Sequence, residues 1–157
     1  MMFPVFALTA CESMMQPVSA TAPGAVVTPA AAGAPAATLN PSPPPRPPAA
    51  ARTVAQFDTT SDADKAQALA VQVDTPVRDL GTTLATLGPP AEPGIWLKTP
   101  LVSSLTMGRV GYKGKDANVE LRPSGGAEGS GSQISLAAMQ TLGIPLTEIA
   151  EVSVSVE

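Results

Sequence analysis

Residues 119–122 read Val-Glu-Leu-Arg, and residues 152–156 read Val-Ser-Val-Ser-Val. Both segments alternate apolar and polar residues. This is the pattern of a β-strand with one buried face, because successive side chains point to opposite faces of a sheet. We therefore expect the apolar residues of both segments to point into a core, and Glu120 and Arg122 to point outward into solvent.

Three further runs between residues 77 and 157 have strand character, and frequent Gly and Pro residues separate them. These runs lie at 80–87, 95–97 and 109–112. An open sheet of short strands would leave two unpaired edges, whereas a closed barrel leaves none. The sequence therefore predicts a mainly β domain over residues 77–157, folded as a small closed β-barrel.

One short helix is expected among these strands. Leu136, Met139 and Leu142 recur at helical spacing and share one face. Ser135 precedes them as a candidate N-cap, and Gly143 follows them as a candidate C-cap. We expect a helix between these two caps, with its apolar face on the barrel core.

A second short helix is predicted before the barrel, within residues 57–76. Ser61 is a candidate N-cap, and acidic residues follow it in the first turn, where they interact favourably with the helix dipole. The helix is expected over 62–72, with Asp74-Thr75-Pro76 ending it.

The preceding segment is rich in Pro and Ala. Between residues 12 and 48 only Glu12 and Arg46 are charged, and Pro recurs every six residues from position 17 to position 41. Pro lacks a backbone N–H and is excluded from helix interiors and central strands. Residues 11–56 are therefore predicted to be a disordered, partly polyproline II tether. Its Pro-rich part, residues 12–48, would span on the order of 100 Å if fully extended.

The first residues point to a membrane anchor. Residues 1–10 are apolar, and Leu8-Thr9-Ala10-Cys11 resembles a bacterial lipobox, in which the Cys is lipidated and becomes the mature N-terminus. We predict that residues 1–10 are part of a lipoprotein signal peptide that begins upstream, because no Lys or Arg precedes the apolar run. Glu12, rather than Asp, after the Cys favours the outer membrane, facing the periplasm. The alternative is a free Cys in a flexible N-terminus.

The composition excludes several kinds of chemistry. The chain has no His, which excludes imidazole acid–base catalysis and His metal sites. A single Cys excludes an intramolecular disulfide and a Cys-cluster zinc site. The formal net charge of −4 argues against a surface for nucleic acid. We expect no metal, no other cofactor and no nucleic-acid partner.

The order of motifs in the second half of the chain suggests a family. Met107-Gly108-Arg109-Val110 is followed by a Gly-containing turn, residues 119–122, a Gly-rich loop, Ile134-Ser135-Leu136 and an Ala-rich helix that ends at Leu142-Gly143. This order resembles the double-psi β-barrel of rare lipoprotein A proteins, which are related in fold to expansins and barwin. The spacing before Leu142 is two residues shorter here. The resemblance implies a double-psi barrel, a lipid anchor with a long tether, and action on peptidoglycan.

The catalytic residues of that family are missing. Its bacterial members cleave glycan strands with an Asp in an Asn-Asp-Arg-Gly-Pro loop, helped by an upstream His. Here the Asp position falls on Pro123, and there is no His. Glu128 in the same loop, or Glu120, is the candidate acid for a divergent lytic transglycosylase, since glycan cleavage needs a proton donor and acceptor. A lone carboxylate in a Gly/Ser loop is more often a solvated surface charge.

Trp96 with nearby Lys98 is the candidate ligand-binding pair, because aromatic rings stack on sugars at carbohydrate-binding surfaces. The alternative places Trp96 in the core of a domain with few other aromatic residues. The sequence as a whole predicts a cell-envelope lipoprotein whose tethered barrel binds peptidoglycan glycan or an envelope protein without catalysis. A divergent transglycosylase-like enzyme and a passive envelope spacer are the two alternatives.

Overall fold

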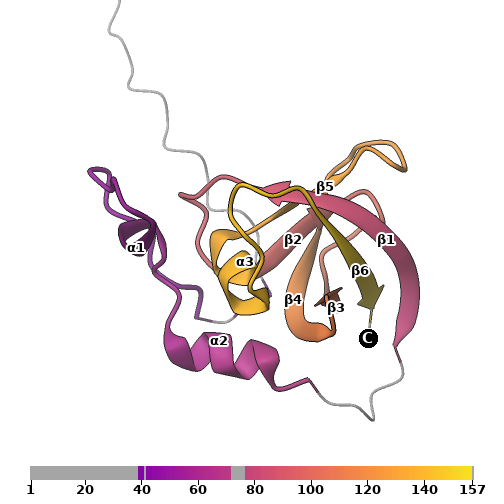
Figure 1. Ribbon diagram of the computed structural model, residues 1–157, viewed down its shortest axis with the longest axis horizontal. Helices are drawn as coiled ribbons and strands as arrows, with labels where there is room; N and C mark the ends of the chain where they lie inside the picture. The colour runs from indigo at the N-terminus through magenta and orange to yellow at the C-terminus, as the bar shows by residue number, and fades with distance from the viewer. Residues whose placement is uncertain (1–38, 41, 72–76, 157) are drawn as a thin grey trace, which may run out of the picture. The chain divides into compact units, whose positions relative to one another are not determined.

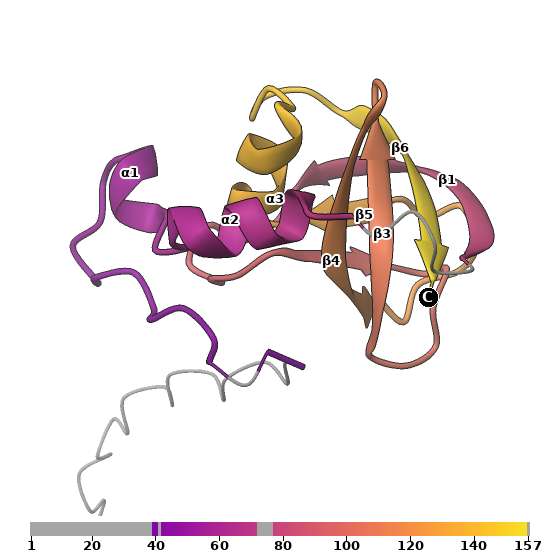
Figure 2. The ribbon, with the colours of Figure 1, turned by 90° about the horizontal axis from the view of Figure 1, so that it is seen from below.

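The computed structural model describes residues 39–40, 42–71 and 77–156. These residues form six strands and three helices, drawn in two perpendicular views (Figure 1 and Figure 2). The strands are β1 (Arg78–Leu87), β2 (Trp96–Thr99), β3 (Thr106–Tyr112), β4 (Lys115–Pro123), β5 (Ser132–Ile134) and β6 (Ala150–Val156). The helices are α1 (Val54–Phe57), α2 (Asp62–Leu69) and α3 (Leu136–Leu142).

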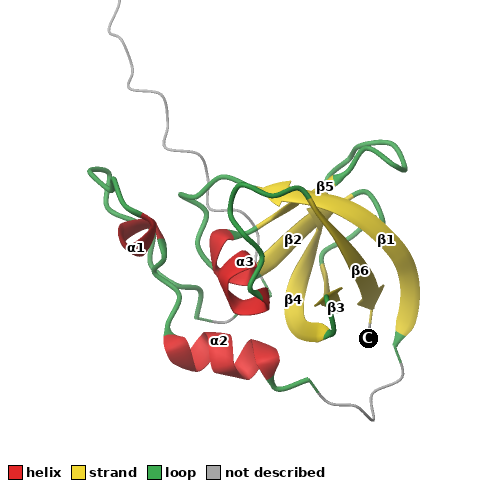
Figure 3. Cartoon of the chain, viewed as in Figure 1, coloured by secondary structure: helices red, strands yellow, loops and turns green. Residues whose placement is uncertain are grey.

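The six strands form a barrel in the order β1-β5-β2-β4-β3-β6, and the pairing of β6 with β1 closes it (Figure 3). Two pairs are parallel, β1 with β5 and β2 with β4, and the other four are antiparallel. The predicted fold class, a mainly β chain with a closed barrel and few short helices, is confirmed.

The barrel interior follows the alternation read from the sequence. Val119 and Leu121 of β4 are buried in the core, as are Val110 of β3 and Val152 and Val154 of β6. The neighbouring residues on each strand face outward. Most core side chains are Val, Leu, Ile and Ala, so the interior is small and filled by branched aliphatic groups.

Helix α3 has the two caps that the sequence predicts. The Ser135 side chain accepts the backbone N–H of Ala138 at 3.2 Å, and Gly143 ends the helix in the left-handed region, at a φ of 74°. Ser135 Oγ also accepts the N–H of Trp96 at 3.1 Å, which connects the helix cap to β2. Met139 and other apolar residues of α3 are part of the barrel core.

Helix α2 begins where predicted and ends earlier. The Ser61 side chain accepts the N–H of Asp64 at 3.1 Å, which confirms the N-cap. The helix ends at Leu69 rather than at residue 72, and the Ala70 carbonyl accepts a hydrogen bond from Asn118 Nδ2 of β4 at 3.4 Å. A side chain of the barrel thus donates a hydrogen bond to a backbone carbonyl at the end of the helix. The predicted terminator at residues 74–76 lies outside the described residues.

The described end of the predicted tether has contacts of its own. Thr53 and Gln56 form a capping box at the start of α1. Ala51 is buried, and the Thr59 hydroxyl donates to the Pro45 carbonyl at 2.6 Å. Leu39 belongs to the same compact unit as the barrel. The boundary expected at residue 57 therefore does not coincide with the start of these contacts.

The predicted signal peptide, Cys11 and the first part of the predicted tether lie outside the described residues. Within residues 39–40, 42–71 and 77–156, no helix has the length and apolar character needed to cross a bilayer.

Candidate functional site

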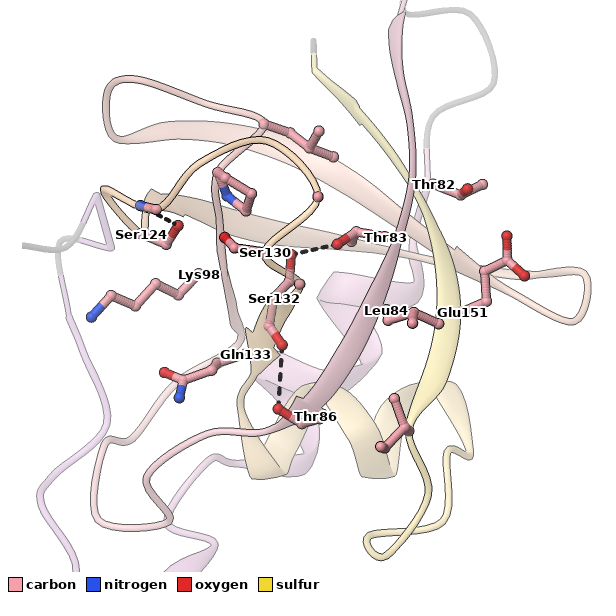
Figure 4. A pocket seen from close by; sticks show the side chains of 16 residues that line it. Thr82, Thr83, Leu84, Thr86, Lys98, Ser124, Ser130, Ser132, Gln133 and Glu151 are labelled. Carbon is pink, nitrogen blue, oxygen red and sulfur yellow. Dashed lines mark hydrogen bonds between the residues drawn. The ribbon is translucent and has the colours of Figure 1, made fainter.

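A groove of about 750 Å³ lies along β1 and β5, beside the Gly-rich loop at 124–131 (Figure 4). Six hydroxyl side chains line it, together with the amide of Gln133: Thr82, Thr83, Thr86, Ser124, Ser130 and Ser132. Its apolar lining consists of Leu84, Pro100, Leu101 and Ile149. A lining of this kind offers hydrogen bonds to a neutral polar ligand and some apolar contact.

The groove hydroxyls are held in place by strand pairing. β1 and β5 run parallel, with Ala85 opposite Ser132 and Thr86 opposite Gln133. The Thr83 and Ser132 hydroxyls lie 2.9 Å apart, and Thr86 Oγ1 donates to the Ser132 carbonyl at 3.4 Å (Figure 4). Because each hydroxyl can both donate and accept, this pair can hydrogen-bond to a ligand while keeping its mutual contact.

The lining includes one cationic and one anionic side chain, Lys98 and Glu151. They lie on opposite sides of the groove in Figure 4. Lys98 is exposed on β2. Glu151 is exposed on β6, opposite Leu84 of β1. Neither Glu151 nor the groove hydroxyls are predicted as ligand-binding residues from the sequence, although the Thr-rich composition of β1 was a signal for the hydroxyls.

Trp96 is not available for sugar stacking. Its side chain is fully buried, and its indole Nε1 donates to the Glu92 carbonyl at 3.4 Å. Gly88 lies so close to the ring that a Cβ built on it would be 2.5 Å from an indole carbon. The buried alternative for Trp96 is therefore the correct one. Its ring lies outside the cluster of residues that fills the barrel interior.

Glu120 is also buried, which corrects the expectation that it points into solvent. Only 5% of the residue is exposed, and the Arg122 Nε donates to its Oε1 at 2.7 Å. Arg122 in turn lies over the Trp96 ring, 5.0 Å from its centroid, and 3.5 Å from the Glu92 carboxylate. The parallel register places Trp96 opposite Glu120. The side chains of Trp96, Glu120 and Arg122 therefore form one group on the outer face of the barrel, which we call the covered patch.

The other candidates are placed apart from this patch. Glu128 is exposed in the Gly-rich loop and does not line the groove. Pro123, at the position of the family's catalytic Asp, is the exposed last residue of β4, and the next residue, Ser124, lines the groove. The structure thus brings neither Glu120 nor Glu128 into the groove.

In the described part of the chain, no three His, Cys, Asp or Glu residues form a group able to hold a metal ion. Comparison with protein-family models, with curated proteins and with solved structures found no match. The geometry of the groove and of the covered patch is therefore the basis for assigning a function.

Proposed function

We propose that this chain is a cell-envelope lipoprotein, anchored through Cys11, whose barrel is of the double-psi type and binds peptidoglycan glycan in the groove without catalysis. The observation that carries the proposal is the set of groove hydroxyls, which suits a ligand rich in hydroxyl and acetamido groups. The lipid anchor, the outer-membrane location and the tether rest on the sequence pattern of residues 1–56.

The arrangement of elements supports the double-psi assignment. The second half of the barrel has the order β3-β4-β5-α3-β6, which is the order of motifs that resembles the rare lipoprotein A proteins. The barrel also contains two parallel pairs between strands that are not consecutive in sequence, β1 with β5 and β2 with β4. Parallel neighbours of this kind require chain crossovers.

A binding role fits the groove better than glycan cleavage. Retaining and inverting glycosidases place two carboxyl groups on either side of the scissile bond. Among the described lining residues, Glu151 is the one carboxylate, while Glu120 is paired with Arg122 under cover and Glu128 lies outside the groove. We therefore favour the non-catalytic module over the transglycosylase-like enzyme.

The test is sedimentation of the full chain with insoluble peptidoglycan. Ser132→Ala combined with Thr83→Val removes the hydroxyl pair with little change in volume, and should weaken retention about thirtyfold, since two hydrogen bonds contribute on the order of 1 kcal/mol each. Ser104→Ala, an exposed substitution outside the groove, is the matched control and should leave retention unchanged.

Two outcomes would contradict the proposal. Equal retention of the groove variant and the control would place the ligand elsewhere, and no retention of the unmodified chain would favour the passive spacer or an envelope-protein partner. In a gel containing peptidoglycan, clearing that disappears in Glu128→Gln or Glu151→Gln would instead establish the enzymatic alternative.

A further inference from the structure

The outer face of the barrel continues beyond the groove. One row of paired residues crosses four strands: Thr86 of β1, Gln133 of β5, Lys98 of β2 and Arg122 of β4. The first three line the groove, and the fourth belongs to the covered patch with Trp96 and Glu120. The groove and the covered patch are therefore adjacent parts of one polar surface.

A segment of the chain itself lies on this patch. We call residues 39–40 and 42–45 the strap. The backbone N–H of Leu39 donates to Glu120 Oε2, and the Pro44 ring lies beside Gly94, which also borders the Trp96 ring. Leu39 is 46% exposed. The strap thus meets Glu120 through a backbone amide and not through the burial of a leucine.

This contact indicates which kind of chemical group can bind to the patch. Glu120 offers a carboxylate oxygen to an amide N–H, while Arg122 holds the other oxygen and fixes the direction of the carboxylate. An N-acetyl group of a glycan and a backbone amide of a peptidoglycan stem peptide both carry such an N–H. In this structure the backbone amide of Leu39 supplies the N–H that Glu120 accepts.

We propose that the covered patch is a second subsite of the groove, for an amide-bearing part of the same polymer, and that the strap occupies it in the absence of ligand. The inference rests on the proposed function, because it extends the same binding face. A tethered occupant competes at a high effective concentration, so it lowers the apparent affinity for the polymer. Weakening the strap should therefore strengthen binding.

The variant Leu39→Pro tests this directly, because Pro has no backbone N–H to give to Glu120. Leu39→Ala keeps the N–H and is the matched control. Trp96 is the only tryptophan in the chain, so its fluorescence reports on this patch alone. In the full chain, we expect Leu39→Pro to increase acrylamide quenching of Trp96 about twofold, and Leu39→Ala to leave it unchanged.

Retention on peptidoglycan supplies the second measurement. Leu39→Pro should increase retention about threefold over the control. A gain on both intact peptidoglycan and peptide-free glycan strands assigns the N–H to the N-acetyl group, and a gain on intact peptidoglycan alone assigns it to the stem peptide.

The outcomes separate the two proposals. Unchanged quenching in Leu39→Pro, with a urea midpoint equal to that of the control, overturns the proposal that the strap occupies the covered patch. Increased quenching without increased retention overturns the second subsite. The groove itself is tested separately, by the retention of the variant that combines Ser132→Ala with Thr83→Val. If no form of the chain is retained, the proposed function fails, and the subsite fails with it, whatever the quenching shows.

Discussion

The guanidinium of Arg122 lies over the indole ring of Trp96, with its central carbon 5.0 Å from the ring centroid. The same guanidinium binds Glu120, so a cation–π contact and an ion pair share one charged group. This layer lies outside the aliphatic interior and contains the fully buried Trp96 and the largely buried Glu120, so part of the outer face of β2 and β4 is shielded from solvent. Substitutions on this face therefore should not behave as surface substitutions.

Glu120→Ala should lower the free energy of unfolding by about 1–3 kcal/mol, because it removes the nearer and more buried of the two carboxylates that pair with the largely buried Arg122. Glu120→Gln keeps an oxygen acceptor and should cost less. Glu151→Ala, at an exposed position on β6, should change the stability by no more than about 0.5 kcal/mol. Urea denaturation of the full chain measures all three. Similar losses for Glu120→Ala and Glu151→Ala would show that the pair with Arg122 contributes nothing.

Ser135→Ala should destabilise the chain by more than Ser61→Ala, although both residues are helix N-caps. Loss of a cap typically costs about 1 kcal/mol. Ser135 Oγ also accepts the N–H of Trp96 in a fully buried position, and leaving that N–H unpaired adds about 1–3 kcal/mol. Thermal or urea unfolding of the two variants isolates this second hydrogen bond as the difference between them. Equal losses would mean that water or another group replaces the Ser135 oxygen.

Leu121→Ala should cost about 2–5 kcal/mol, the range for truncating a fully buried leucine. A domain of this size has a total stability of about 5–15 kcal/mol, so the change removes a large share of it. The measurement is the urea concentration at the midpoint of unfolding, with the slope of the unfolding free energy against urea (the m-value) unchanged. A loss of unfolding free energy below about 1 kcal/mol would mean that the core relaxes around the space left by the leucine side chain.

Gly108→Ala should destabilise the barrel, because a Cβ at this position would lie 2.4 Å from the backbone carbonyl oxygen of Ser155 and 2.4 Å from Leu121 Cδ1. Overpacking of this kind costs typically about 1–3 kcal/mol. At Gly126 the nearest atom is the Ser130 hydroxyl, in an exposed loop that can adjust, so Gly126→Ala is the control and should cost less. Unfolding experiments that rank the two variants in the opposite order would contradict the close approach of β3 and β6.

Cys11→Ala tests the proposed anchor. The variant should move from the membrane fraction to the soluble periplasmic fraction, because the Cys11 thiol is the group proposed to carry the lipid. Fractionation with carbonate extraction and immunoblotting measures the shift. A variant that still pellets with membranes after carbonate treatment would exclude lipidation at Cys11.

The elements of the barrel could be predicted because their signals are local. Alternation over 119–122 and 152–156 placed two strands, and the Ser135 and Gly143 caps placed α3 with its correct ends. The strand order could not be predicted, because it depends on pairing between segments far apart in the chain. The closed barrel itself followed from a general argument about unpaired edges and not from any single residue.

The burial of Glu120 shows where local patterns stop being informative. Its alternation with Val119 and Leu121 gives the correct direction, away from the barrel interior. Whether that direction leads to solvent depends on Trp96 in the neighbouring strand and on Leu39, which is 81 residues away in the sequence. The hydroxyl groove is hidden for the same reason, since Thr83 and Ser132 meet only when β1 pairs with β5.

Closure of the barrel by β1 and β6 has a consequence for synthesis. β1 leaves the ribosome first among the strands, yet its antiparallel partner is β6, which pairs with it from Ala85 opposite Ala150 to Arg78 opposite Val156. A nascent chain therefore exposes open hydrogen-bonding edges on β1 and β3 until the last strand has been translated. The barrel cannot close before β6 has been synthesised, so a chain that stops before residue 150 keeps the edges of β1 and β3 open.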